Sequence, residues 1–178
     1  MKKIYMTTIL IFTILFTGCI KDISPQGLTI SIPASTVTES LQQQFPITQS
    51  FTFGKIHLTD PQAILKQGSN RVLTGTSIGY SSSLIPMQKG SLYLSGVPYF
   101  DARSGNIFLR EPKIEKLSFN QYKLSSFIQG PMQQAILPII NEIFRKTPIY
   151  RINKSSIQSS FLKNIYVSNG ELLVTFGL

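Results

Sequence analysis

The sequence predicts an α+β fold in which a curved antiparallel β-sheet wraps around a long α-helix in the C-terminal half. Runs of alternating apolar and polar residues, separated by glycine-containing turns, are typical of antiparallel strands. One segment, residues 124–146, instead shows helical spacing of apolar residues over most of its circumference. Glycines inside the predicted strands are costly unless a sheet bends, so we expect the sheet to curve.

The N-terminus has the pattern of a bacterial lipoprotein signal over residues 1–18. Lys2 and Lys3 provide a positive start, and residues 9–16 form an apolar run that is too short to cross a bilayer as a helix. The sequence Phe16-Thr17-Gly18-Cys19 resembles a lipobox, where lipoproteins are acylated on cysteine and cleaved. The alternative is an ordinary secretory signal with an incidental cysteine. Because Cys19 is the only cysteine, an intramolecular disulfide is excluded.

Acylation of Cys19 is expected to anchor the chain, since two or more acyl chains hold a protein stably on a membrane. Ile20 rather than an aspartate follows the cysteine. In lipoproteins of Gram-negative bacteria, which this chain resembles, the absence of that retention signal implies the outer membrane, with the protein facing the periplasm. Residues 19–26 are predicted to form a flexible lipidated tether, and residues 27–178 a single domain.

The domain is predicted to begin with a strand and a helix. Residues 27–32 alternate as a strand does, and Ser35 or Thr36 is a candidate cap for the helix that follows. Glu39 occupies the capping-box position after Thr36, and Pro46 ends the helix. Its apolar stripe has three members at four-residue spacing: Val37, Leu41 and Phe45.

The remaining strands are predicted on both sides of the 124–146 helix. An antiparallel meander precedes it, with turns at 67–70 and 102–105 and four strand-like runs: 51–58, 72–80, 90–100 and 107–119. Pro112 interrupts the last run, so its two ends are expected as two strands around a bulge or an edge position. After the helix, Asn169-Gly170 is a strong hairpin signal between two strands, 162–167 and 172–176.

Five motifs occur in order along the chain: Val72-Leu73-Thr74-Gly75, Pro98-Tyr99-Phe100-Asp101, and residues 105–111, 137–141 and 147–152. With the lipobox, they resemble the YceB-like lipoproteins of the DUF1439 family over nearly all of the mature chain. The resemblance implies a curved sheet that wraps a long helix, similar to tubular lipid-binding domains of the bactericidal permeability-increasing protein (BPI-like) type. It implies a fold and a location but no activity.

Two functions follow as hypotheses, the first by analogy with that fold. In the first, a lipid or another hydrophobic ligand binds between the helix and the sheet, against Leu92, Leu94, Ile136, Ile140 and Phe144. A closed core filled by these same side chains is the alternative. In the second, the anchored domain is an adaptor that recruits or positions cell-wall or outer-membrane components. Its candidate contacts are exposed aromatic residues: Tyr99, Tyr122 and Tyr150.

The residues do not favour an enzyme, a metal site or a cofactor. His57 is the only histidine and lies in a predicted strand, with no free thiol to complete a nucleophilic or metal site. Four acids could contain a catalytic pair, although structural hydrogen bonding is the favoured role: Asp60, Asp101, Glu111 and Glu115.

The formal net charge of +9 indicates which classes of partner the protein is expected to attract. A basic surface favours anionic lipid head groups or other envelope polyanions, with an ordinary solvated surface as the alternative. The cations are dispersed along the chain and no nucleic-acid-binding motif occurs, so nucleic acid is not an expected partner.

Overall fold

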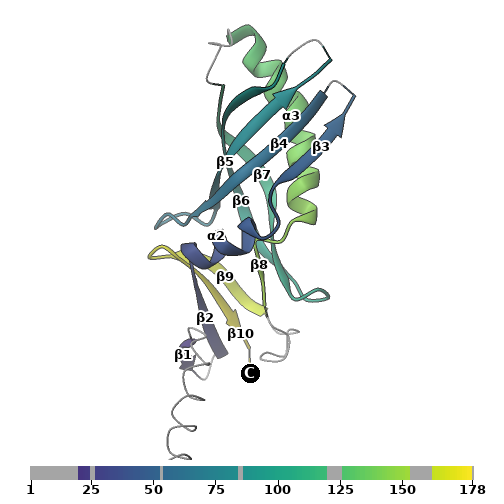
Figure 1. Cartoon of the computed structure of the whole chain (residues 1–178). Helices are drawn as coiled ribbons and strands as arrows, with labels where there is room; N and C mark the ends of the chain where they lie inside the picture. Colours follow the sequence, from purple (N-terminus) through teal and green to yellow (C-terminus); the bar gives the residue numbers. More distant parts are fainter. Residues whose placement is uncertain are drawn as a thin grey trace, which may run out of the picture.

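The computed structural model describes residues 20–24, 27–52, 54–83, 86–119, 126–152 and 162–177. Over these residues the protein is mostly β, with two antiparallel sheets, helix α2 between them and helix α3 alongside the larger sheet (Figure 1). The predicted combination of antiparallel strands and helices is therefore confirmed in outline. The strands form two sheets, however, rather than the single sheet that the sequence predicts.

The larger sheet has six strands in the order β3-β4-β5-β6-β7-β8, each antiparallel to its neighbours. The strands are β3 (Ile47–Phe51), β4 (Gly54–Ile64), β5 (Val72–Ser81), β6 (Gln88–Asp101), β7 (Asn106–Phe119) and β8 (Tyr150–Arg151). Strands β5, β6 and β7 confirm three predicted strands almost residue for residue. The sequence misses β3, because the three central residues of this strand are all polar and show no alternation.

The pairing of β6 with β7 is irregular. One of its two register shifts falls between Ser95 and Val97, opposite Glu111 and Pro112. Glu111 has a φ of 52°, in the left-handed region that few residues other than glycine adopt. The bulge expected from Pro112 is therefore confirmed, and β7 continues through it as one strand.

The smaller sheet has the order β1-β2-β10-β9. Its strands are β1 (Ile20–Ser24), β2 (Gly27–Pro33), β10 (Glu171–Phe176) and β9 (Leu162–Ser168). Asn169 and Gly170 join β9 to β10 with φ values of 51° and 78°, which confirms the predicted hairpin. The sequence assigns Ile20–Ser24 to a flexible tether, whereas these residues form β1 and pair with the edge of β2.

Helix α2 (Ala34–Gln42) joins the two sheets. The predicted cap at Ser35 or Thr36 is wrong, because the helix already begins at Ala34 and no side chain caps it. Thr38 instead links the helix to β4, since its Oγ1 accepts a hydrogen bond of 2.9 Å from the backbone N–H of Ala63. The predicted apolar stripe is confirmed at its two fully buried residues, Val37 and Leu41.

Helix α3 (Ser126–Lys146) packs against β7, and one continuous core joins it to both sheets. Phe100 of β6 meets Phe176 of β10 edge to face, with the ring centroids 5.6 Å apart, so aromatic packing connects the sheets directly. Within the described residues, neither helix combines the length and apolar character needed to cross a membrane.

Candidate functional site

The five residues predicted to line a ligand site all lie in the core between α3 and the larger sheet. They share one cluster of buried side chains: Leu92 and Leu94 of β6, and Ile136, Ile140 and Phe144 of α3. Their exposed fractions run from 0% for Leu92 and Ile140 to 6% for Phe144. The structure therefore brings all five together, although they lie on elements far apart in the sequence.

This interior is less well covered along β7 than at its centre. Strand β8 pairs with β7 only at Asn106 and Ile107, so within the described chain the rest of β7 forms an edge of the sheet. Helix α3 packs against this edge. Three apolar side chains of β7 are only partly buried against the core, as is one of the helix that packs on this strand, and we call these four the lateral seam: Ile114, Leu117 and Phe119 of β7, and Ile139 of α3.

Two threonines introduce polar groups into this apolar interior from β5. Thr76 donates a hydrogen bond of 2.6 Å to the carbonyl oxygen of Thr59. Thr74 is 2% exposed, and its Oγ1 has no hydrogen-bond partner within the described residues. It lies directly across from Leu94 in the pairing of β5 with β6. A buried hydroxyl without a partner is costly, so Thr74 is a point where a polar group of a ligand could bind.

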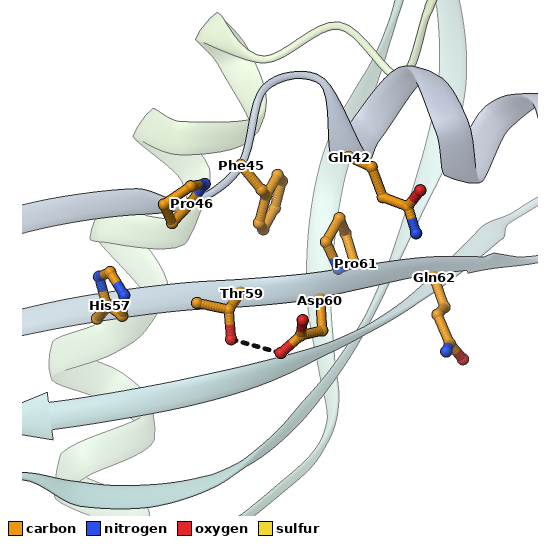
Figure 2. Close-up of a pocket in the computed structure, with 8 residues that line it drawn as sticks. All are labelled: Gln42, Phe45, Pro46, His57, Thr59, Asp60, Pro61 and Gln62. Atoms are coloured by element: carbon orange, nitrogen blue, oxygen red, sulfur yellow. Dashed lines mark hydrogen bonds between the residues drawn. The ribbon is translucent and has the colours of Figure 1, made fainter.

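A second candidate site is the groove between the end of α2 and strand β4 (Figure 2), which holds a volume of about 500 Å³. Its walls come from Gln42, Phe45, Pro46, His57, Thr59, Asp60, Pro61 and Gln62. Asp60 has a φ of 52°, at a register shift between Thr59 and Gln62. Backbone strain of this kind clusters at functional sites. The sequence predicts one strand over residues 51–58, whereas Phe51 ends β3 and β4 runs from Gly54 through the bulge to Ile64.

The histidine and the carboxylate of the groove are not hydrogen-bonded to each other. His57 lies in β4, as predicted, and its Nδ1 shares a hydrogen bond of 2.7 Å with the hydroxyl of Thr48 on β3. The carboxylate of Asp60 accepts a hydrogen bond of 2.7 Å from Thr59 Oγ1, and Figure 2 shows this contact pointing away from His57. Histidine and carboxylate therefore each bind a neighbouring threonine and not one another.

Two of the other acids also make structural hydrogen bonds. Asp101 accepts bonds from the backbone N–H of Arg103 and from the hydroxyl of Ser104, which lie 3.2 Å and 2.6 Å away. The Ser104 hydroxyl is the main reason that the pKa of Asp101 is lowered. Glu115 accepts a bond of 2.6 Å from Ser95 Oγ, which likewise lowers its pKa. Within the described residues, no three histidine, cysteine or acidic side chains gather as metal ligands would.

The structure describes two of the three tyrosines that the adaptor hypothesis names, Tyr99 and Tyr150. Tyr99 stacks on Phe108 across the outer face of the larger sheet, the face opposite α3, with the ring centroids 5.8 Å apart. Tyr150 is half-buried in β8, where it pairs with Ile107. Tyr122 and Cys19 lie outside the described residues. The lipidation of Cys19 therefore stays a prediction.

The fold and this interior define a class of protein: a mostly β domain whose larger antiparallel sheet packs against one helix over an apolar core. The chain belongs to the DUF1439 family, described as a protein of unknown function, whose profile matches residues 32–171. This match confirms the family resemblance of the sequence motifs, and it spans both helices and the whole larger sheet. Comparison with curated proteins gives no match.

Proposed function

We propose that this protein is a lipid-anchored envelope domain that binds an acyl chain, or a ligand of similar shape, between α3 and the larger sheet. The sheet curves around α3, and the lipid on Cys19 holds the domain on the periplasmic face of the outer membrane. The protein is a carrier or sensor of the ligand rather than an enzyme. The observation that carries this proposal is the lateral seam, where the apolar interior is only partly covered.

Curvature of the larger sheet is supported by its bulges and glycines. The ladder shifts register in β4 and twice between β6 and β7, and bulges of this kind bend a strand and increase its twist. Gly90 of β6 approaches β7 so closely that a Cβ at this position would lie 2.0 Å from the carbonyl oxygen of Ser118. Close strand contacts at glycine are typical of sharply bent sheets.

The lateral seam gives an acyl chain a route into this interior that breaks no backbone hydrogen bond between strands. Its side chains belong to an edge strand and to a helix, so they can separate without disrupting the sheet ladder. Each methylene that moves from water into the interior contributes about 0.8 kcal/mol. Burial of several methylenes would outweigh the local rearrangement of the seam.

The test uses the absence of tryptophan from the chain, which lets a single introduced indole report contact with a ligand. Leu117→Trp places the indole in the lateral seam. Val97→Trp, on the outer face of the same sheet, is the matched control. We expect dibromostearate to quench the fluorescence of Leu117→Trp strongly and saturably, because bromine quenches an indole only in contact.

The control variant is expected to keep its emission over the same range of dibromostearate concentration. Equal quenching of both variants would indicate non-specific association with the surface. No quenching of Leu117→Trp, in a variant whose circular dichroism shows that it is folded, would remove the support for an acyl-binding interior.

The adaptor remains a second candidate, and one observation favours it. Tyr99 and Phe108 form a half-buried aromatic pair on the outer face, and aromatic residues of this kind are enriched at protein interfaces. A photo-crosslinking residue in place of Phe108 is expected to trap one defined envelope protein in cells if this function is correct. The same residue in place of Lys89 is the control, and identical products from both positions would contradict the adaptor.

A further inference from the structure

The outer face of the larger sheet carries a second concavity, which lies on the opposite side of the sheet from α3. It holds a volume of about 470 Å³ where the end of β4, the start of β5 and the middle of β6 and β7 meet. Its walls come from Ile64, Lys66, Ser69, Arg71, Leu73, Tyr93, Ser95, Glu115 and Lys116. We call this concavity the outer-face pocket.

Positive charge dominates this pocket. Lys66, Arg71 and Lys116 line it, against the single acid Glu115. The carboxylate of Glu115 is already engaged, because one oxygen accepts the Ser95 hydroxyl and the other lies 3.9 Å from Lys113 Nζ. Within the described residues, the ammonium groups of Lys66 and Lys116 have no ion-pair partner. A concavity lined by unbalanced charge of one sign concentrates ions of the opposite sign.

Three hydrogen bonds hold the guanidinium of Arg71 in the lining of this pocket. Its Nε donates to Ser95 Oγ at 2.8 Å, and its Nη2 donates to the carbonyl oxygens of Ser95 and Glu111 at 3.0 Å and 2.5 Å. These bonds use three of the five N–H groups of an arginine. The two N–H groups of Nη1 have no partner within the described residues, and because they diverge from one nitrogen, each can donate one charge-assisted hydrogen bond to a phosphate oxygen.

The rest of the lining is apolar or aromatic. Tyr93 lies over Gly75 so closely that a Cβ on this glycine would be 3.1 Å from the ring, so the ring forms a flat wall beside the cations. Ile64 and Leu73, both half-buried, also line the pocket. This combination suits an anion that carries an apolar body better than it suits an inorganic ion alone.

We propose that the outer-face pocket binds a phosphate group attached to an apolar or aromatic body, with Arg71, Lys66 and Lys116 as its ligands. This inference is independent of acyl-chain binding, because the sheet separates the two sites. The phosphate belongs either to a small soluble molecule or to a lipid head group at a membrane surface.

The test titrates the chain from residue 19, carrying Cys19→Ala, with phenyl phosphate and follows backbone amides by NMR. Changing both Lys66 and Lys116 to Gln is expected to weaken binding about ten-fold, because two charge-assisted contacts are lost. Changing Lys55 and Lys89 to Gln removes the same charge outside this pocket and is the control. Glu115→Gln is expected to tighten binding about three-fold, because it removes the one acid of the lining.

In a second arm, vesicles that contain phosphatidylglycerol supply a lipid-borne phosphate with a net negative charge. Phosphatidylcholine vesicles, in which a choline cation neutralises the phosphate, are the comparison. Saturable binding supports the pocket if it is lost in the Lys66 and Lys116 variant and kept in the control variant. The arm in which this binding occurs identifies the source of the phosphate. Equal weakening in both double variants, or no saturable binding to either probe, would overturn the proposal.

Discussion

Arg71 shows how a single side chain compensates for an irregular backbone. The pairing of β6 with β7 shifts register at the bulge opposite Gly96, and the Arg71 guanidinium donates to two carbonyl oxygens beside it, those of Ser95 and Glu111. A hydrogen bond to a charged group contributes about 1.5–3 kcal/mol. We therefore expect Arg71→Ala to lower the free energy of unfolding by about 2–3 kcal/mol, as measured by urea denaturation.

Arg110→Ala is the matched control for this prediction. Arg110 lies 3.9 Å from the carboxylate of Glu111, and both side chains are well exposed, at 62% and 71%. An exposed ion pair of this kind contributes at most about 1 kcal/mol. If both variants lost the same stability, Arg71 would not act through the bulge carbonyls.

Two threonines on one strand provide a test of the buried polar groups. The Thr74 hydroxyl has no hydrogen-bond partner among the residues that the structure describes, so we expect Thr74→Val to raise the free energy of unfolding by about 1 kcal/mol. The Thr76 hydroxyl donates to Thr59, so Thr76→Val is expected to lower it by about 1 kcal/mol. Thermal unfolding of the ligand-free protein measures both. Effects of the same sign would show that the environment of Thr74 differs from the one described.

The turn after β6 is expected to respond to pH through Asp101. Its pKa is lowered in the folded protein, chiefly by the Ser104 hydroxyl. The stability that this carboxylate contributes is therefore complete above its ordinary pKa and is lost as the pH falls through the lowered value. Ser104→Ala is expected to bring the pKa of Asp101 back towards its ordinary value. A carboxyl-carbon NMR titration measures this shift, and an unchanged pKa would contradict the role of Ser104.

At the scale of the elements, glycines act for two different reasons. Gly170 has a φ of 78° in the β9–β10 turn, while a Cβ there would meet nothing closer than 3.9 Å. Gly170→Ala is therefore expected to cost only the strain of the left-handed backbone, about 1 kcal/mol. Gly90→Ala is expected to cost about 3 kcal/mol, because its Cβ would lie 2.0 Å from the Ser118 carbonyl oxygen. Urea denaturation of the two variants measures both losses of stability. A larger loss for Gly170→Ala than for Gly90→Ala would contradict this distinction.

The sequence predicts the elements whose patterns are local. Alternation locates β5, β6 and β7, and Asn169-Gly170 locates the final hairpin, because turn geometry depends on the residues of the turn itself. The bulge in β4 is missed, since Asp60-Pro61 is also a common turn signal. The start of α2 is misplaced for a related reason, because candidate cap residues occupy positions inside the first turn of the helix.

At the scale of the whole molecule, pairing between distant segments is the part that local patterns do not predict. β2 pairs with β10 near the two ends of the described chain, and this pairing divides the strands into two sheets. The five residues predicted to line the ligand site belong to one buried cluster, because each is apolar on a face that must be covered, whereas their contact with a ligand stays a prediction. The groove and the outer-face pocket escape prediction, since their walls combine residues from segments that become neighbours only in the folded protein.

The most direct test of the central claim, an acyl-type ligand between α3 and the larger sheet, is the intact mass of protein purified from its native envelope. Wild type and Cys19→Ala are compared under gentle and then denaturing conditions. We predict a covalent mass increment that disappears in Cys19→Ala, together with a non-covalent lipid in both proteins that is released on denaturation. Absence of a non-covalent lipid from both proteins, with no protection against unfolding by added lipid, would contradict the claim.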